Sequence, residues 1–497
     1  MGETVSTLSR RILHAMGIFG GTQVAVVAMS VLRNKLMALW LGPAGVGLNA
    51  IYTTTRDLIQ AGAGLSLRTG AVREIASAPV PERPAIEGAV RSVSAALALA
   101  GAAITLLLSP ALSYWTMGTT AQWWCFALLA TSVGAAIWLE CDMAALQGEG
   151  HIAPLARVTL LSALVATAVA VPLYYGLRLQ AVLPVYLIMT YAYALWAARE
   201  RRRFCPRPAR VPLREAWRVM APELRLGLYL TAAAVLTQLA SYLFVVFMTH
   251  TDGTGGLGLY QSGFMLVNTY VLVVFSAITN EYYPRLASVA SSGIRTAAFA
   301  GGEFKVAAWV LMPVVVSFVV LSEPVVRLLY SRDFLAVLPY VDLGICGVLP
   351  RAFSYCMAFV ILARGDGRVF VATEAAGAVL GLACSIIGYR MGGFPGLGAG
   401  YVVEYVLYSA VVLLAIRRYG LRMSLRPVLL CAGATLLCLA AVLLKDLLGP
   451  WLTALATLPW LLPLAFHELR GKKQPVNKKS RRGAEEFERK GNKQIDK

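Results

Sequence analysis

Charged residues are scarce in this chain. Asp, Glu, Lys and Arg together make up 14% of its 497 residues, whereas a soluble protein typically carries about 25%. Apolar runs of roughly 20 residues, the length of a membrane-spanning helix, recur along the sequence. The composition therefore excludes an ordinary soluble protein and predicts an all-α, polytopic membrane protein.

Motifs for cofactor and metal chemistry are also missing. The sequence has no Walker A loop, no HExxH, no G-x-S-x-G elbow and no Rossmann fingerprint, so neither an enzyme nor a cofactor is expected. There is no CxxC, and no histidine stands at ligand spacing from a cysteine, so no metal site or disulfide framework is predicted. The eight cysteines, mostly within apolar runs, are interpreted as small packing residues: Cys125, Cys141, Cys205, Cys346, Cys356, Cys384, Cys431 and Cys438.

A cleavable signal peptide is not recognisable either. Arg10 and Arg11 precede an apolar run from Ile12 to Leu32 that is too long for a signal sequence, and this run is interpreted as the first span. The formal net charge is +19, but the basic residues mostly flank apolar runs, so no nucleic-acid partner is expected. With both termini in the cytoplasm, 23 Lys and Arg residues fall in the cytoplasmic connections and 7 on the opposite side, as the positive-inside rule requires.

Fourteen candidate spans can be drawn. They cover residues 11–32, 41–66, 86–109, 121–146, 154–176, 178–198, 224–249, 256–281, 302–321, 336–363, 369–391, 395–416, 427–447 and 450–467.

The chain also repeats itself. Gly45-Val-Gly-Leu48 recurs as Gly256-Leu-Gly-Leu259, and Gln147-Gly-Glu-Gly150 is matched by Arg364-Gly-Asp-Gly367, at offsets of 211 and 217 residues. Spans 1–6 and 7–12 are therefore interpreted as two copies of one unit. Six spans is an even number, so the copies share one orientation and are related by a pseudo-two-fold axis along the membrane normal.

This repeat defines the predicted domains. Residues 1–198 and 224–418 form two six-helix lobes, and residues 199–223 form a basic cytoplasmic linker between them. Residues 419–469 hold two extra transmembrane helices, and residues 470–497 form a basic cytoplasmic tail whose composition predicts disorder.

Cations inside the spans are the first candidates for a binding site. Arg56 lies midway through the second span, Arg351 lies in the tenth, and Arg33 and Lys35 close the first. A charge facing lipid at mid-membrane costs about 2.5–3.5 kcal/mol even on mild scales, so such residues usually face a cavity. Two alternatives stay open: ion pairing, of Arg56 with Asp57 or Arg351 with Asp342, and snorkelling of Arg33 and Lys35 to the interface.

Carboxylates form the second set. Glu140 and Asp142 lie late in the fourth span and Glu404 lies in the twelfth. Such groups can carry protons or sodium in coupled transporters, or they can form salt bridges. Three polar amides could bind sugar hydroxyls or link helices, and the sequence does not separate these roles: Gln238, Asn268 and Asn280.

Several motifs resemble a known family. LGPAGVGL at Leu41–Leu48 is followed by a polar stretch with an Arg and then by AGAG at Ala61–Gly64. GLYQSGFMLVNTYVLVVFSAITNEYYPRLAS follows Gly256, and ATEAAGAVLGL and PGLGAGYVVEYVLY lie between Ala372 and Tyr408. In this order they are similar to the polysaccharide repeat-unit flippases, of the O-antigen and lipid III type, in the multidrug/oligosaccharidyl-lipid/polysaccharide exporter superfamily.

This resemblance implies a flippase in the bacterial inner membrane. Two lobes in a V shape would move an undecaprenyl-pyrophosphate-linked oligosaccharide to the periplasmic leaflet by alternating access, with a cationic central cavity. A polysaccharide polymerase and chain-length proteins are implied as possible partners. The spans at 427–447 and 450–467 depart from the twelve-span pattern and resemble the longer lipid II flippases. A drug or cation antiporter of the same superfamily, and a membrane glycosyltransferase or polymerase, remain alternatives.

Overall fold

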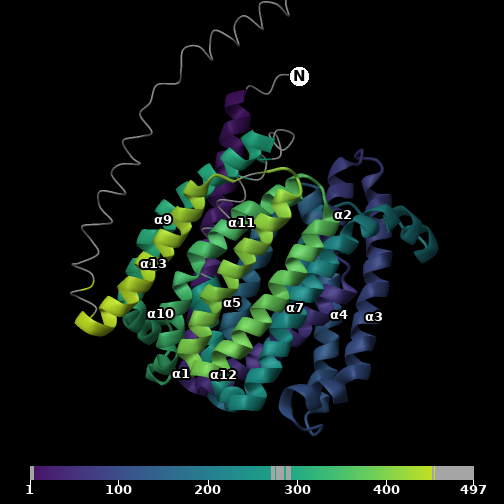
Figure 1. Cartoon of the computed structure of the whole chain (residues 1–497). Helices are drawn as coiled ribbons and strands as arrows, with labels where there is room; N and C mark the ends of the chain where they lie inside the picture. The colour runs from purple at the N-terminus through teal and green to yellow at the C-terminus, as the bar shows by residue number, and fades with distance from the viewer. Residues whose placement is uncertain are drawn as a thin grey trace, which may run out of the picture.

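The computed structural model describes residues 5–269, 275, 282, 285–286, 293–421, 423–449 and 453. Every regular element within these residues is a helix (Figure 1), as the composition predicted. Eight helices of the described part are long and apolar enough to cross a membrane, or nine if a bent pair is counted as one further span. The predicted fourteenth span, 450–467, lies outside the described residues apart from Thr453, and the number of fourteen is not established.

Six helices form the first part of the chain. They are α1 (Val5–Ala63), α2 (Leu67–Ser77), α3 (Arg83–Met117), α4 (Trp123–Gly148), α5 (Ile152–Leu177) and α6 (Val182–Phe204), with the 3-10 turn η1 (Arg178–Ala181) before α6.

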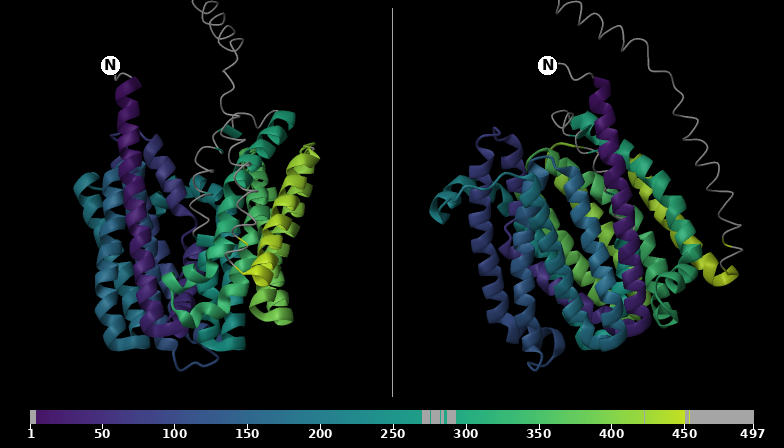
Figure 2. Two further views of the ribbon diagram at one scale, coloured as in Figure 1. Left: turned by 90° about the vertical axis from the view of Figure 1, so that its left-hand side faces the viewer. Right: turned by 180° about the vertical axis from the view of Figure 1, so that it is seen from behind.

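The second part begins with another long helix. Its elements are α7 (Leu213–Phe264), the π-helical turn η2 (Met265–Thr269), α9 (Gly293–Leu329), the 3-10 turn η3 (Arg332–Val337), α10 (Leu338–Cys346), α11 (Val348–Ala363), α12 (Gly367–Arg417) and α13 (Leu425–Leu448). In Figure 2 the first part lies to one side of the molecule and α9–α13 to the other.

Glycines break two of the long helices in the same way. α1 is divided at Gly42, with φ 64° and ψ −165°, and α7 is divided at Gly253, with φ 69° and ψ −171°. This backbone region is essentially open to glycine alone. The two breaks are 211 residues apart, which is the offset of the first sequence repeat. A third helix, α12, is broken at Gly392 and Gly393.

The limbs that follow the first two breaks touch each other through a reciprocal contact. A Cβ atom on Gly47 would lie 1.9 Å from the carbonyl oxygen of Thr254, and one on Gly258 would lie 1.8 Å from that of Pro43. Gly47 and Gly258 are 211 residues apart, and so are Pro43 and Thr254. Position i of each repeat thus meets position j of the other, which is the pattern of a two-fold interface.

Helix boundaries differ from the prediction in two places. The helix of the first span continues through Arg33 and Lys35 to the break at Gly42, because LRNKLMALWL contains no residue that stops a helix. The predicted linker is largely helical, since α6 runs to Phe204 and α7 starts at Leu213, and residues 205–212 alone connect them.

The segment 205–212 packs across the start of α3. The Ala209 N–H donates to the carbonyl of Pro84 at 2.8 Å, and the Ser92 hydroxyl donates to that of Val211 at 2.7 Å. We call the end of the bundle that carries this segment and α2 the α2 end. The opposite end carries the breaks at Gly42 and Gly253 and is called the Gly42 end.

Apolar side chains cover the outside of the bundle as well as its core. Leu107, Leu328 and Leu436 are 80%, 73% and 66% exposed, and many other large apolar side chains are exposed on α3, α9 and α13. An exposed apolar surface of this extent marks a protein that faces lipid. Buried aromatic residues such as Phe126, Phe304 and Phe353 fill the interior.

On the α2 end, Asp366 caps α12. Its carboxylate accepts a hydrogen bond from the Val369 N–H at 3.2 Å and one from the Tyr419 hydroxyl at 2.9 Å. These two hydrogen bonds hold the pKa of Asp366 below its usual value.

Candidate functional site

Two polar cavities lie on either side of α7. The first, which we call the Arg56 cavity, has a volume of about 420 Å³ and is bounded by α1, α2, α4 and α7. The second, the Arg351 cavity, has about 380 Å³ and is bounded by α7, η2 and α10–α12. Gln238 of α7 lines the first cavity and Thr237 and Ser241 line the second. One helix therefore separates two sites that belong to different parts of the chain.

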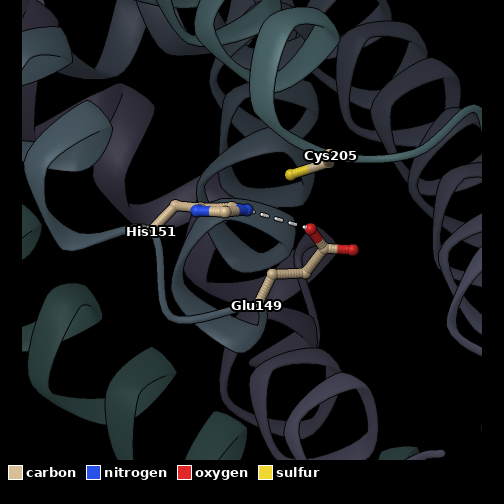
Figure 3. A group of neighbouring side chains, drawn as sticks. All are labelled: Glu149, His151 and Cys205. Atoms are coloured by element: carbon tan, nitrogen blue, oxygen red, sulfur yellow. Dashed lines mark ion pairs between the residues drawn. The ribbon is translucent and has the colours of Figure 1, made fainter. Parts of the chain in front are cut away.

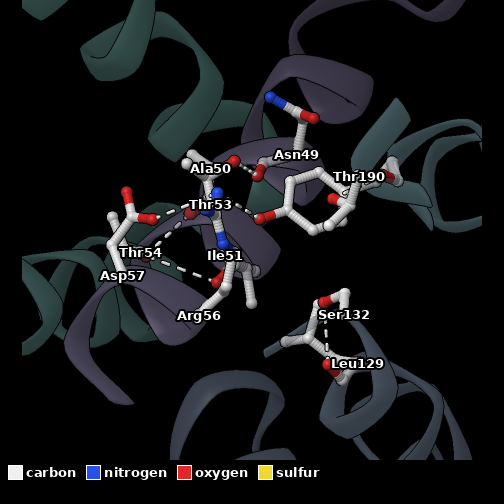
Figure 4. Close-up of polar contacts among 11 residues, drawn as sticks. Asn49, Ala50, Ile51, Thr53, Thr54, Arg56, Asp57, Leu129, Ser132 and Thr190 are labelled. Carbon is white, nitrogen blue, oxygen red and sulfur yellow. Dashed lines mark hydrogen bonds and ion pairs between the residues drawn. The ribbon is translucent and has the colours of Figure 1, made fainter. Parts of the chain in front are cut away.

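Arg56 sits in the second limb of α1 and is partly buried. Its Nη1 lies 3.4 Å from the carboxylate of Asp57 and donates to the hydroxyl of Tyr186 at 3.4 Å. Its Nε is buried and has no hydrogen-bond partner among the described residues. Figure 4 shows the guanidinium beside Asp57. On the same helix, the hydroxyls of Thr53 and Thr54 donate to backbone carbonyls one turn earlier. Arg56 thus keeps unused donor capacity inside the cavity wall.

A second arginine enters the same cavity from α2. Arg68 pairs with Glu140 of α4, with 2.9 Å between Nη1 and Oε2, and both side chains line the cavity. The Arg56 cavity therefore holds two arginines and two carboxylates, and these charges balance when all four are ionised.

Arg351 in α11 lies deeper, among aromatic side chains. Its Nη1 donates to the Asn268 side-chain oxygen at 2.5 Å and to the Tyr401 hydroxyl at 3.0 Å. The guanidinium also lies 5.4 Å from the ring centre of Phe275 and 5.5 Å from that of Tyr405, within cation–π range. Arg351 thus connects η2, α11 and α12 and does not pair with Asp342.

Two carboxylates share this cavity with Arg351. Glu404 of α12 lines the wall and packs closely on Gly381, where a Cβ would lie 2.9 Å from its Oε1. Glu374, also of α12, accepts a hydrogen bond from the Tyr408 hydroxyl at 2.9 Å. With one arginine and two carboxyl groups, the Arg351 cavity is not the purely cationic site that the family resemblance implied.

A third hollow is apolar and adjoins the Arg56 cavity. It has a volume of about 690 Å³ and lies between α1, α3 and α7. Leu58 and Ile59 line it, whereas the adjacent Asp57 and Gln60 line the Arg56 cavity. One turn of α1 therefore presents polar groups to one space and apolar groups to the next. We call this hollow the apolar groove.

Three of the predicted site residues line neither polar cavity. Lys35 donates to the carbonyl oxygens of Arg327, at 2.9 Å, and Tyr330, at the C-terminal end of α9, where a cation is favoured by the helix dipole. Arg33 is half-buried near Tyr174. Asp142 is fully buried and pairs with Arg91 at 2.8 Å.

Asp342, the alternative ion-pair partner predicted for Arg351, pairs with another residue. Asp342 pairs with Lys445 of α13 at 2.5 Å, and Lys445 also donates to the Ser322 hydroxyl at 2.7 Å. The alternative of pairing between Arg56 and Asp57 is present in the structure. Asn280 lies outside the described residues.

Several residues of the site were not predicted. Arg68 lies between the predicted spans 41–66 and 86–109, and Glu374 lies within the predicted span 369–391. A useful signal for Glu374 was its neighbourhood, since the small residues Ala375, Ala376 and Gly377 leave space beside it. The tyrosines of α12, at 401, 405 and 408, follow one helical face with the spacing of about four residues.

Comparisons with known proteins agree with this architecture. Residues 89–339 match the family model described as "Polysaccharide biosynthesis protein". No curated protein sequence matches the chain.

Solved structures share the fold at low sequence identity. The inward closed form of the lipid II flippase MurJ is 11% identical, with a TM-score of 0.69, and the match covers 92% of this chain and 99% of that one. An inward-facing multidrug resistance transporter of the MATE family and the MOP superfamily is 15% identical, with a TM-score of 0.66 over 79% and 94% of the chains. A MOP superfamily transporter from Pyrococcus furiosus is 15% identical, with a TM-score of 0.59 over 82% and 95%.

These structures show the fold of the exporter superfamily whose resemblance the motifs suggested. The family match extends from α3 to α10 and includes the helix, α7, that separates the two polar cavities. The match covers just over half of the sequence, and the chain belongs to the polysaccharide biosynthesis protein family.

Proposed function

We propose that the protein is a flippase for lipid-linked oligosaccharide units whose headgroup carries a pyrophosphate. The match to a family described as polysaccharide biosynthesis proteins supports this cargo class. The fold supports the transport of an amphiphile, because one structure of this fold is a lipid II flippase. The finer assignment, to an undecaprenyl-pyrophosphate-linked unit of O-antigen or another surface polysaccharide, rests on the motif resemblance.

The observation that carries this proposal is the position of the Arg56 cavity next to the apolar groove. The groove could take part of a polyprenyl chain while the cavity takes the phosphates and the first sugars, because a single turn of α1 faces both. Arginine is suited to this role, since its guanidinium binds phosphate oxygens through two parallel hydrogen bonds. The unpartnered Nε of Arg56 leaves one such donor in place.

Balanced charges in the Arg56 cavity suggest how the headgroup would be bound and released. In this structure Asp57 is the ion-pair partner of Arg56, and Glu140 is the ion-pair partner of Arg68. An incoming pyrophosphate would replace these carboxylates as the partner of Arg56 and Arg68. Protonation or cation binding at the displaced carboxylates would then couple cargo movement to an ion gradient, and Glu140 keeps its predicted ion-coupling role in this proposal.

The Arg351 cavity supports a second candidate function. Its two carboxyl groups outnumber its one arginine, and a site richer in acidic than in basic groups is suited to a proton, a sodium ion or an organic cation. In the flippase, Glu404 would serve as the ion-coupling group. In a drug or cation antiporter of the same superfamily, the same cavity would bind the cargo itself.

Orientation and partners complete the proposal. The distribution of Lys and Arg supports a cytoplasmic position for the α2 end and both termini, and the membrane would be the bacterial inner membrane. A polymerase and chain-length proteins would act on the cargo after its transfer.

Binding of the lipid-linked cargo tests the two functions directly. Purified protein in nanodiscs would be titrated with an undecaprenyl-pyrophosphate-linked oligosaccharide and, separately, with an organic cation. We expect the lipid to bind and Arg56→Gln to weaken its binding about 10- to 100-fold, because a hydrogen bond to a charged group contributes roughly 1.5–3 kcal/mol. Arg332→Gln, an exposed arginine of η3, is the matched control and should bind as the unchanged protein does.

The outcomes separate the candidates. Tight binding of the organic cation that is lost in Glu404→Gln, with no binding of the lipid, would favour the antiporter. Equal lipid binding by Arg56→Gln and the unchanged protein would reject the assigned role of the Arg56 cavity. In cells, the Arg56→Gln protein should insert into the membrane in normal amount and yet fail to support surface polysaccharide.

A further inference from the structure

Three side chains with different donor atoms meet at the α2 end, away from both polar cavities. Glu149 and His151 come from the turn between α4 and α5, and Cys205 directly follows α6. Figure 3 shows the carboxylate, the imidazole and the thiol turned toward one common space. One carboxylate oxygen, one ring nitrogen and Sγ all lie within 4.8 Å of one another. The sequence did not reveal this group, because Cys205 is 54 residues beyond His151.

The backbone fixes these positions. Gly150 has a φ of +81°, which a glycine adopts without strain, and the turn is closed by a hydrogen bond of 2.8 Å from the His151 N–H to the Leu146 carbonyl. This brings the side chains on either side of Gly150 onto the same face. The Cys205 N–H is bonded to the Arg201 carbonyl at 2.9 Å, so the last turn of α6 holds the thiol in place.

Burial and charge at this point are unusual for ordinary surface residues. The Glu149 side chain is 7% exposed and Cys205 is 8% exposed, whereas the His151 side chain is 35% exposed and leaves an opening to solvent. A second carboxylate, Glu87, lies against Glu149 and is 2% exposed. Its Oε2 is paired with Arg201 at 2.7 Å, but its Oε1 has no hydrogen-bond donor among the described residues.

Two carboxyl groups in contact need a positive charge or a shared proton between them. Arg201 supplies one positive charge, and it is paired with Oε2 of Glu87. A cation bound by Glu149, His151 and Cys205 would supply the other. It would be neutralised by the Glu149 carboxylate and a Cys205 thiolate, while Glu87 and Arg201 balance each other.

We infer that Glu149, His151 and Cys205 form a binding site for a zinc-type divalent metal ion. Nitrogen, thiolate sulfur and carboxylate oxygen are the three donors that Zn²⁺ takes in proteins, with bonds of about 2.0–2.3 Å in tetrahedral geometry. Ligand atoms of such a site lie roughly 3.3–3.8 Å apart, so small side-chain rotations close the distances seen here. Water would take the fourth position through the opening beside His151, and the Cys205 proton would leave to solvent.

A metal at this site would act on the connection between the two parts of the chain. Cys205 is the first residue of the segment 205–212, whose later residues are already bonded to α3 through Ala209 and Val211. The metal would fasten the first residue to the turn between α4 and α5. The whole segment would then be held on the first part of the chain while α7 starts immediately after it.

Metal binding to the full-length protein tests the inference. Protein purified in detergent would be stripped with a chelator, titrated with Zn²⁺ and then with Co²⁺, and analysed for metal content, for cobalt–thiolate absorption and for thermal stability. We expect one zinc ion per chain, a cobalt–thiolate band, and a higher melting temperature with zinc. Cys205→Ser, His151→Asn and Glu149→Gln should each lose at least tenfold in zinc affinity.

Matched controls keep the test specific. Cys384→Ser, a partly exposed cysteine of α12, and His250→Asn, whose ring bonds to the Trp115 carbonyl, lie elsewhere in the fold and should bind zinc as the unchanged protein does. Elution of each variant as a monodisperse peak shows that it is folded. Zinc affinity that is equal in the unchanged protein and in Cys205→Ser, or a protein that binds no zinc at all, would mean that the cluster is only an ion pair of His151 with Glu149 beside a buried thiol.

Discussion

Ionisable side chains inside the helices fall into two kinds. Some line a cavity, such as Arg56 and Glu404, and others are paired within helix packing, such as Asp142 with Arg91 and Asp342 with Lys445. Both kinds appear in the sequence as isolated charges in apolar runs. They differ only in whether a cavity or an oppositely charged side chain faces them, and this depends on how other helices pack against them.

Asp142 is expected to serve stability and not transport. Its side chain is fully buried, Arg91 is its ion-pair partner, and Arg91 also lies 4.4 Å from the ring centre of Trp138. Asp142→Ala would leave the partly buried guanidinium of Arg91 without its ion-pair partner, which costs less than the roughly 3–5 kcal/mol typical of a fully buried pair. We expect a clearly lower melting temperature for the purified variant, whereas Asp446→Ala, an exposed carboxylate at the end of α13, should melt like the unchanged protein.

Transport activity per folded molecule completes this comparison. Asp142→Ala should retain it once the amount of folded protein is taken into account, because Asp142 lines neither polar cavity. An Asp142→Ala protein that melts normally and yet fails to transport would indicate an ion-coupling role for Asp142.

At the scale of residues, the sequence predicted one arginine in each polar cavity but not most of the side chains around it. Arg56 and Arg351 could be selected because a cation in an apolar run needs a polar environment. Lys35 could not be assigned correctly by the same reasoning, since its partners are backbone carbonyls at the end of α9, almost 300 positions away. Arg68 was placed in a loop because the short helix α2 is too polar to look like a span.

At the scale of helices, the breaks are as informative as the helices themselves. The sequence predicted separate spans on both sides of Gly253, where the structure has a break. The structure also breaks α1 at Gly42, which lies inside the predicted second span, 41–66. Residues 33–40, which lie between the first two predicted spans, are helical in the structure, so the first helix extends beyond its predicted end. Polar residues alone do not end a helix when their side chains find partners, as Lys35 does.

Replacing either break glycine should destabilise the protein by a similar amount. Gly42→Ala and Gly253→Ala would each force a Cβ into a backbone conformation that costs about 1–3 kcal/mol for residues other than glycine. We expect comparable losses of thermal stability in the two variants. Gly302→Ala, in the middle of α9 with open space around it, should be neutral or slightly stabilising, since alanine favours helix by about 1 kcal/mol over glycine.

Unequal effects would be equally informative. If Gly42→Ala were tolerated and Gly253→Ala were not, the two breaks would contribute differently to stability although they occupy matching positions of the repeat. Thermal melting of both variants in the same detergent is sufficient to distinguish these results.

On the scale of the whole molecule, the close approach of Gly47 and Gly258 joins the two parts of the chain at the Gly42 end. Backbone atoms touch there without intervening side chains. At the α2 end, α7 also approaches the segment that follows α1, since a Cβ on Gly227 would lie 3.1 Å from the Leu65 carbonyl oxygen. The Arg56 cavity extends toward this end through Gly64, Ser66 and Leu67. Within the described residues, the tightest backbone contact between the two parts therefore lies at the Gly42 end, and the Arg56 cavity lies toward the other end.

Gly47→Ala should open the Gly42 end. The added methyl group would sit 1.9 Å from the Thr254 carbonyl oxygen, so the limbs must separate. Leu257, which is fully buried beside this contact, can report the change: in a Leu257→Cys background, a water-soluble maleimide should label the Gly47→Ala protein at least tenfold faster, which corresponds to about 1.4 kcal/mol of population shift.

The matched control is Gly21→Ala in the first limb of α1, where a Cβ meets no neighbour. It should leave the labelling rate unchanged. Slow labelling in the Gly47→Ala protein, with normal stability, would show that the limbs absorb the methyl group without moving apart.

A contact that pairs position 47 with 254 and position 43 with 258 is one that two identical polypeptides could make with each other. An ancestor encoding a single unit could have assembled as a homodimer through this surface, and gene duplication with fusion would have preserved it. Fusion also frees the two copies to diverge in charge. The present chain shows that divergence, with two arginines facing two acids on one side of α7 and a lone arginine facing two acids on the other.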